Sequence, residues 1–240
     1  MAAAFVAAVL GLLALFHTAP FPSGFDGSAG GRSVWRMPAS SASPTIYLTY
    51  DDGPNPEATG ALLDVLAEGG ARATFFLIDD HVTGETAPLV RRMFAEGHAV
   101  AVHSNERWLA FETPGAIASR ITRAAERIAQ AGGAPPCRVF RPHAGWRSPA
   151  MFAALTRLDY RLVGWSWNAW DFNWFRPRTA GSVVNRITSR ASDGLIVVIH
   201  DGHHADPRAD RRYAVDATRA LLPALRARGF GFGTVCRASD

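Results

Sequence analysis

From Thr45 onward the chain alternates short apolar runs with longer amphipathic runs, and this alternation constrains its fold more than any other feature. Parallel strands need a crossover between them, usually a helix, so the alternation predicts a parallel sheet. We expect an α/β fold: a distorted (β/α) barrel of about seven parallel strands in a single domain, with a doubly wound sheet as the alternative. The expected strands are Ile46–Tyr50, Thr74–Ile78, Ala99–Val102, Arg138–Phe140, Arg161–Trp165, Leu195–Ile199 and Phe230–Val235.

Proline and glycine bracket the amphipathic runs as they usually bracket helices. Pro56 is expected to open the first helix, Thr113-Pro114 the third and Ser148-Pro149 the fourth. Gly97 is expected to close the second helix, and Gly132-Gly133 the third. These helices would supply the crossovers that a parallel sheet requires.

A side chain that can bind or react follows most of the predicted strands. In a barrel and in a doubly wound sheet alike, ligand sites form at the carboxyl ends of the strands. Solvation alone does not explain why polar residues of different types collect there, so we expect a functional site on this face. Its residues are Asp51 and Asp52 after the first strand, His103 after the third, Arg141 after the fourth, Asp171 after the fifth and His200 after the sixth.

The pair Asp51-Asp52 stands where the first strand breaks at Gly53-Pro54. Neighbouring side chains on a strand point in opposite directions, so one carboxylate can hold a cation while the other handles a proton. Like charges this close need a counter-ion, which predicts a metal ion or an arginine nearby. The alternative is an Asp-rich turn that merely precedes a helix.

Five segments occur in an order and spacing that resemble the polysaccharide deacetylase family, the NodB-homology domain of carbohydrate esterases. The segments are Thr49–Pro54, His103–Arg107, Arg141–Gly145, Trp167–Phe172 and Val197–His200. The resemblance implies a distorted (β/α) barrel that removes N- or O-acetyl groups from glycans such as chitin, peptidoglycan or xylan. It also implies a divalent metal as the cofactor, and zinc is the metal we expect.

The resemblance assigns a role to each residue of the expected site. Hydrolysis of an acetamide needs an activated water and a proton for the departing amine, and a metal lowers the pKa of the water. The implied roles are Asp51 as general base, Asp52 and His103 as metal ligands, Arg141 as the partner of Asp51, His200 as general acid and Asp171 as the residue that tunes His200.

Arg107 departs from the family's metal motif, His-Ser/Thr-x-x-His, at the second histidine. A guanidinium stays protonated and does not bind a cation, so two protein ligands remain where a catalytic site usually has three. The sequence does not choose among the substitutes, which are Asp80, His81, Asn105, Glu106, His143 and His203.

Two further motifs differ from the family pattern. Asn168 and Phe172 stand in place of the first Asp and the Trp of the motif D-x-x-D-W. Ala144 replaces a tyrosine, but the contact implied there for an oxyanion is a backbone N–H, which alanine retains.

Aromatic residues are frequent near the fourth and fifth strand ends. Trp146, Trp170 and Phe172 are the expected substrate-binding residues, because aromatic faces suit sugar rings. The alternative for this group, which also includes Trp165, is that the rings only pack the top of the barrel.

The ends of the chain and its charge bear on its location and partners. Residues 1–19 predict an apolar signal or anchor, residues 20–44 a Gly/Ser/Pro-rich linker, and residues 45–240 the catalytic domain. We expect export or inner-membrane anchoring, with membrane association through residues 1–16; the alternative is a cytoplasmic protein with an over-long start. The net charge is +4, but no basic stripe with interleaved aromatics points to nucleic acid.

The two cysteines, Cys137 and Cys236, fall at the start of one predicted strand and beyond the end of another. This layout places them at opposite ends of a barrel and argues against a disulfide, which needs closely spaced Cα atoms.

Two functional hypotheses follow. The first is a metal-dependent hydrolase that removes acetyl groups from an N-acetylated glycan. The second is a catalytically silent glycan-binding or cell-wall assembly protein in which the cation of Arg107 replaces the metal. The retention of Asp51, Arg141, Asp171 and His200 together favours the enzyme.

Overall fold

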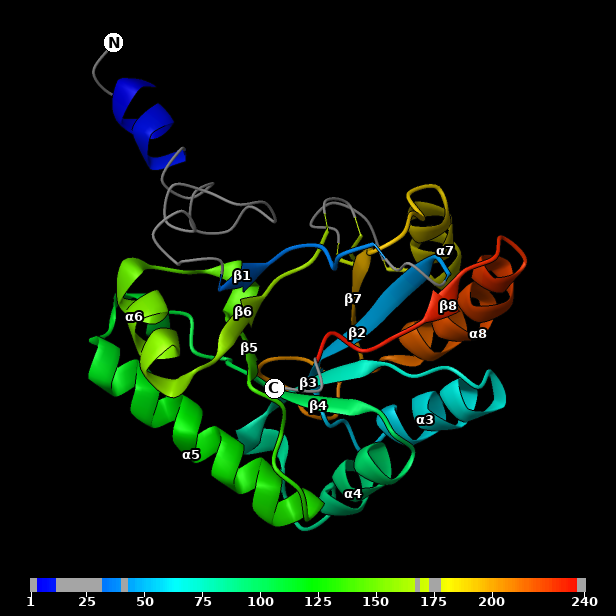
Figure 1. Cartoon of the computed structure of the whole chain (residues 1–240), viewed down its shortest axis with the longest axis horizontal. Coiled ribbons are helices and arrows are strands. Elements are labelled where there is room, and N and C mark those ends of the chain that lie inside the picture. The colour runs from blue at the N-terminus through cyan, green and yellow to red at the C-terminus, as the bar shows by residue number, and fades with distance from the viewer. Residues whose placement is uncertain (1–3, 12–31, 40–42, 167–168, 173–177, 237–240) are drawn as a thin grey trace.

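A curled sheet of parallel strands forms the centre of the molecule (Figure 1). The computed structural model describes residues 4–11, 32–39, 43–166, 169–172 and 178–236. The strands are β1 (Ser33–Val34), β2 (Thr45–Gly53), β3 (Thr74–Ile78), β4 (Ala99–His103), β5 (Val139–Arg141), β6 (Arg161–Val163), β7 (Ile196–His200) and β8 (Gly231–Phe232). They run in the order β1-β6-β5-β4-β3-β2-β7, β8 also pairs with β2, and these pairings are parallel.

The segment after β6 closes the sheet against β7. Ser166 N donates to Ile196 O at 3.0 Å, and Asp171 N donates to Val198 O at 3.1 Å. Val198 N in turn donates to Ala169 O at 2.8 Å. These backbone hydrogen bonds pair the segment after β6 with β7, the last strand of the order, so the curled sheet closes into a distorted barrel. The expected barrel is confirmed, and the doubly wound alternative is wrong.

Helices surround the outer face of the barrel and pack side by side in chain order, with α8 between α7 and α3 (Figure 1). Ile117, Ile121 and Ile128 show how the pattern works, because their spacing puts all three on one buried face. The α-helices are α3 (Thr59–Glu68), α4 (Ala87–Ala95), α5 (Pro114–Gly132), α6 (Pro149–Leu158), α7 (Ala180–Thr188) and α8 (Arg212–Arg226), and the 3-10 turns are η1 (Asp79–His81), η2 (Leu109–Phe111) and η3 (His143–Gly145).

The predicted helix ends are mostly confirmed. Thr113 Oγ1 accepts from Ala116 N at 3.3 Å and caps α5, and Ser148 Oγ accepts from Met151 N at 3.2 Å and caps α6. The prediction for the first helix is wrong by three residues, because α3 begins at Thr59. Asn55 Oδ1 accepts from Glu57 N at 2.8 Å and holds the preceding residues in a turn.

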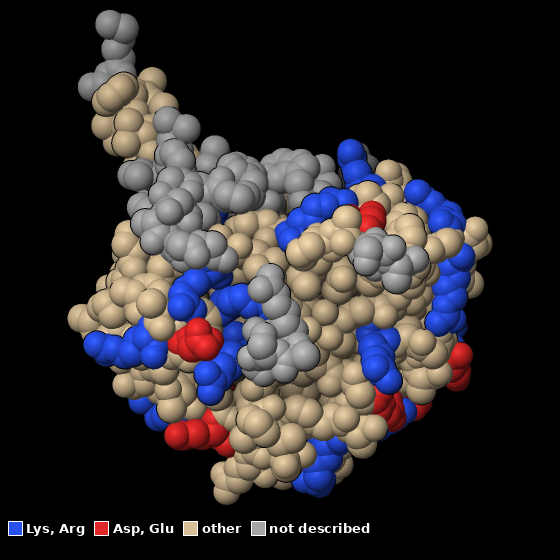
Figure 2. All heavy atoms as spheres, in the orientation of Figure 1, with Lys and Arg blue, Asp and Glu red and all other residues tan. Residues whose placement is uncertain are grey.

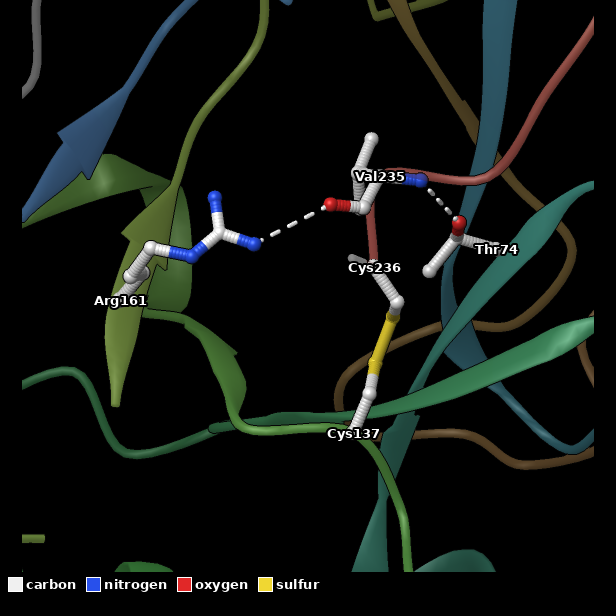
Figure 3. The surroundings of a disulfide bond; sticks show 5 residues. All are labelled: Thr74, Cys137, Arg161, Val235 and Cys236. Carbon is white, nitrogen blue, oxygen red and sulfur yellow. Dashed lines mark hydrogen bonds between the residues drawn. A yellow bond between two sulfur atoms is a disulfide. The ribbon is translucent and has the colours of Figure 1, made fainter. Parts of the chain in front are cut away.

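A disulfide links Cys137 to Cys236, so the expectation of unpaired cysteines is wrong (Figure 3). The last predicted strand is only β8, which pairs with Thr45 and Ile46 at the amino end of β2. The chain therefore stays at that end of the barrel, where Val235 N donates to Thr74 Oγ1 at 3.0 Å. Cys137 lies at the same end, and the two Cα atoms are 6.1 Å apart.

The linker prediction is wrong for residues 32–39, which pack on the barrel. β1 pairs with β6, and Met37 N donates to Gly194 O at 2.9 Å. Trp35 is buried against Gly164, where an added Cβ would overlap the indole ring. Trp35 belongs to the hydrophobic core, so this segment is part of the barrel and not a linker.

Residues 4–11 of the expected apolar segment are helical, with exposed side chains. Among the helices in the described residues, none is both long and apolar enough to cross a membrane. On the face shown in Figure 2, arginine side chains lie in separate groups, several of them beside acidic side chains.

Candidate active site

The structure brings the six expected site residues to the carboxyl ends of neighbouring strands. Asp51 and Asp52 lie near the end of β2, and His103, Arg141 and His200 are the last residues of β4, β5 and β7. In the sheet register, Asp51 is opposite His200, and His103 is opposite Arg141. Asp171 joins them through the segment that closes the barrel.

Asp51 is fixed by Arg141 in the buried interior. Arg141 Nη1 donates to Asp51 Oδ1 at 2.5 Å and to Thr49 Oγ1 at 2.8 Å. Its remaining nitrogens donate to backbone carbonyls, Nε to Val163 O at 2.9 Å and Nη2 to Gly164 O at 2.7 Å. The guanidinium is therefore satisfied on all three nitrogens and holds the carboxylate in one orientation.

Asp52 faces His103 across a short gap. Asp52 Oδ1 lies 3.2 Å from His103 Nε2. His103 Nδ1 lies 2.7 Å from Arg141 O and must donate to it, so Nε2 carries the lone pair of the neutral ring. A carboxylate oxygen and an imidazole lone pair facing each other need a proton or a cation between them.

The pKa values of this pair reflect the same attraction. Burial by itself raises the pKa of Asp52, but the hydrogen bond with His103 and the charges of His200, His103 and His143 outweigh it and hold the pKa below its usual range. Burial lowers the pKa of His103. The charge of Asp51 and the contact with Asp52 raise it by more, so the pKa lies above its ordinary value. The position thus stabilises positive charge.

The donor set of Asp52 and His103 fits a divalent metal ion, since carboxylate and imidazole are common zinc ligands. In the described part of the chain, no group of three His, Cys, Asp or Glu side chains stands ready to hold an ion. Asp52 and His103, the two metal ligands expected from the sequence, lie in contact with each other in the structure.

Several of the substitute ligands are engaged elsewhere. Asp80 pairs with Arg127 at 2.8 Å, and Glu106 pairs with Arg120 at 3.1 Å. His203 Nδ1 accepts from Asp206 N at 3.1 Å. Asn105, His81 and His143 remain of the substitutes that the sequence offers.

His81 and His143 are the imidazoles that remain near Asp52. His81 Nδ1 donates to Asp52 O at 2.9 Å, so it supports the backbone of that residue. Burial, with the charge of His103, lowers the pKa of His143 to about 4, while Asp52 acts in the opposite direction. His143 is thus a neutral imidazole within electrostatic reach of Asp52 and His103.

Arg107 contacts His204. Its side chain is exposed, and Nη2 donates to His204 Nε2 at 3.2 Å. The ring of His204 lies 5.1 Å from that of His143. The ion pair of Asp52 is with His103, so the arrangement in which Arg107 neutralises Asp52 is not the one observed.

Asp171 holds His200 and raises its basicity. Asp171 Oδ1 lies 2.7 Å from His200 Nδ1, and Oδ2 accepts from His200 N at 2.8 Å. Burial lowers the pKa of His200, but the charge of Asp171 and this hydrogen bond raise it to about 9. For Asp171, burial raises the pKa, but the charge of His200 and three hydrogen bonds lower it to about 2. His200 is therefore protonated at neutral pH, as a general acid requires.

Tyr213, near the start of α8, is a site residue that the sequence did not reveal. Its hydroxyl donates to Asp171 Oδ2 at 2.6 Å and so completes the hydrogen bonding of that carboxylate. A single tyrosine in a run of charged residues carries no pattern that connects it to a site 42 residues away.

Asp201, directly after His200, is a second residue to which the sequence assigns no individual role. Its Oδ2 accepts from Thr59 Oγ1 at 2.5 Å, while Oδ1 is buried and has no partner among the described residues. Burial raises its pKa to about 7, and the charges of Asp52 and Asp51 act in the same direction. An added Cβ at Gly53 would lie 2.8 Å from Asp201 Oδ2, so the turn after Asp52 requires glycine.

The expected substrate-binding aromatics occupy two places. Trp170 and Phe172 stack at 5.0 Å between ring centroids, and Phe172 lies 6.2 Å from the His200 ring. Trp146 follows η3 and lies 6.2 Å from Phe111. Trp165 is buried in the core beneath Phe172, so packing is its role. Trp167, Asn168, Trp174 and Phe175 lie outside the described residues.

Fold and site together place the chain among hydrolases built on a distorted (β/α) barrel. It belongs to the polysaccharide deacetylase family: the family model described as Polysaccharide deacetylase matches residues 39–163. The family resemblance inferred from the five sequence segments is confirmed.

Individual relatives agree with this family. The chain is 37% identical over 199 residues to a chitooligosaccharide deacetylase of Rhizobium leguminosarum bv. trifolii, covering 80% of this chain and 90% of that protein. It is 31% identical to a peptidoglycan-N-acetylglucosamine deacetylase of Bacillus cereus, covering 85% of this chain and 92% of that protein. Among solved structures it resembles a family 4 acetyl xylan esterase from Clostridium thermocellum in complex with a cobalt ion, with a TM-score of 0.69 and 27% identity over 80% of this chain and 88% of that one.

Proposed function

We propose that the protein removes acetyl groups from an N-acetylated glycan by hydrolysing the C–N amide bond. One observation carries the proposal: a clamped carboxylate, Asp51, and a protonated imidazole, His200, lie opposite each other on adjacent strands beside the pair Asp52 and His103. A base, an acid and a cation position are the parts that amide hydrolysis needs. The relatives named as deacetylases of chitooligosaccharide and peptidoglycan support this substrate class.

Each residue has a defined part in the reaction. Asp51 accepts a proton from the attacking water, and Arg141 keeps its carboxylate in place for this step. His200 gives its proton to the departing amine nitrogen as the C–N bond breaks, so the products are acetate and a free amine. Ala144, in η3, offers its backbone N–H to the developing oxyanion.

A divalent ion, for which we propose zinc, would be held by Asp52 and His103. When bound, it would lower the pKa of its water and polarise the acetyl carbonyl. The cobalt ion in the acetyl xylan esterase supports a divalent metal in this fold. Arg107, in place of the second histidine of the family's metal motif, favours the glycan-binding protein as the second candidate.

Acetate release and metal content together test the proposal. The purified protein, incubated with zinc or cobalt, should release acetate from N-acetylated chitooligosaccharides or from peptidoglycan and should retain about one metal ion per chain. Asp52→Ala should abolish both metal uptake and acetate release. A protein that binds these glycans but takes up no metal and releases no acetate would support the silent glycan-binding protein instead.

We also propose that the protein is exported. The disulfide between Cys137 and Cys236 supports this location, because disulfides persist in oxidising compartments. The apolar start of the chain is consistent with a signal or anchor that also brings the protein to the membrane. Labelling of free thiols in cell fractions tests the proposal: the exported form should carry none, and a cytoplasmic pool with both thiols reduced would contradict it.

A further inference from the structure

Two aromatic side chains beside the site remain exposed while the rest of the fold buries its large apolar residues. Trp108 is 72% exposed and Phe111 is 63% exposed. Within the described part of residues 32–236, no other large apolar side chain is similarly exposed. With the half-buried Trp146, they form what we call the aromatic surface (Trp108, Phe111 and Trp146).

The local geometry places the two exposed rings together. Phe111 N donates to Trp108 O at 2.9 Å, which is the i to i+3 hydrogen bond of a 3-10 turn. Side chains three residues apart in such a turn lie above one another, and the ring centroids are 5.9 Å apart. Leu109 and Ala110 of the same turn are buried, so the turn is anchored on its inner side. The third ring, Trp146, continues the series 6.2 Å from Phe111.

Arg120 of α5 braces both ends of this segment. Its Nη1 contacts Glu106 Oε1 at 3.1 Å, and its Nη2 contacts Glu112 Oε1 at 2.9 Å. Exposed ion pairs contribute little to stability one by one, but here a single guanidinium ties down residues on both sides of the turn. The turn that carries the rings is therefore held in place before a ligand arrives, which lowers the entropy cost of binding.

The aromatic surface is continuous with the active site. Trp108 directly follows Arg107, whose guanidinium contacts His204. His204 packs against His143, and Trp146 N donates to His143 O at 3.0 Å. A polymer whose reacting unit lies at Asp51 and His200 therefore meets these rings with its neighbouring units.

We propose that the aromatic surface binds further sugar units of the same glycan chain by stacking on their apolar C–H faces, an inference that rests on the proposed deacetylase function. Charge favours this occupant over anionic ones, because the two glutamates beside the rings offset Arg107 and Arg120. A neutral polyol with apolar ring faces suits an aromatic surface with a polar rim.

Chain length provides the test. For the wild type, kcat/KM should rise from a short N-acetylated chitooligosaccharide to a longer one, mainly through KM. Trp108→Ala and Phe111→Ala should each reduce this advantage by about two- to tenfold. Trp108→Phe keeps an aromatic face and should restore most of the advantage, whereas Trp108→Leu keeps only apolar bulk and should not. A length advantage that survives Trp108→Ala/Phe111→Ala would overturn the proposal.

A binding assay separates this proposal from the proposed function. If the wild type releases no acetate, its removal from solution by insoluble chitin or peptidoglycan still measures glycan binding by the aromatic surface. Weaker depletion for Trp108→Leu than for Trp108→Phe would then support the aromatic surface although the deacetylase function had failed. Equal depletion would overturn it. Analytical ultracentrifugation tests the alternative occupant, a second copy of the chain. Self-association of the wild type that is lost in Trp108→Ala would show an interface between copies and would contradict glycan binding by the aromatic surface.

Discussion

The two halves of the active site differ in how completely the fold determines them. On one side, Asp51 and Arg141 are 2% and 0% exposed, and each guanidinium nitrogen has an acceptor. On the other, Asp52 Oδ1 and His103 Nε2 face each other at 3.2 Å, and His143 is a neutral imidazole within electrostatic reach of both. We call Asp51 with Arg141 the base side and Asp52 with His103 the metal side, after their proposed roles; contacts within the chain fix the base side more completely.

Loss of the Arg141 guanidinium from the base side should reduce the stability of the protein more than any other change considered. Arg141→Met leaves Asp51 as an uncompensated buried charge, so the free energy of unfolding should fall by about 3–5 kcal/mol. Urea denaturation measures the change. Adding Asp51→Asn to the same chain removes that charge and should recover part of the loss. A variant Arg141→Met as stable as the wild type would show that the base side is not determined by this pair.

Asp51→Asn alone should separate catalysis from folding. The amide still accepts from Arg141 but cannot take a proton from water, so the rate of acetate release should fall by about 10²–10⁴-fold. Metal content should remain that of the wild type, because Asp52 and His103 are untouched. Rates, metal analysis and circular dichroism together check this, and a variant with near-normal rates would exclude Asp51 as the base.

The metal side should gain from the substitution that restores a ligand. Arg107→His should raise the affinity for zinc by about 10–100-fold, measured by competition with a chelating dye. Arg107→Gln is the matched control, because it removes the cation without adding an imidazole. Equal gains in both variants would attribute the effect to lost repulsion, and no gain in either would mean that position 107 does not face the ion.

The difference between the two halves also explains what the sequence could predict. Asp51, Arg141 and His200 end strands within recognisable segments, so strand pattern and motif order were enough to bring them together. Tyr213 and Asp201 depend on where a distant helix and a neighbouring turn pack, which no local pattern encodes.

The errors in the fold have a similar cause. The disulfide was missed because the short β8 stays at the amino end of β2, and strand length cannot be read from an apolar run alone. Residues 32–39 look like a linker in composition, but the burial of Trp35 against Gly164 makes them part of the barrel. Each error concerns a contact between segments far apart in the chain.

Tyr213→Phe should change the site least, and it tests how far Tyr213 modulates the pKa of His200. In the metal-free protein, His200 should titrate with a pKa of about 9, and its proton should be lost as the pH rises through that value. Without the phenol, Asp171 loses one of the hydrogen bonds that share its charge, so its attraction for His200 strengthens. The pKa should therefore rise, by less than about one unit since a single hydrogen bond is removed. An NMR titration of the His200 ring measures the shift, and a lower pKa in the variant would mean that Tyr213 supports the protonated histidine by another route.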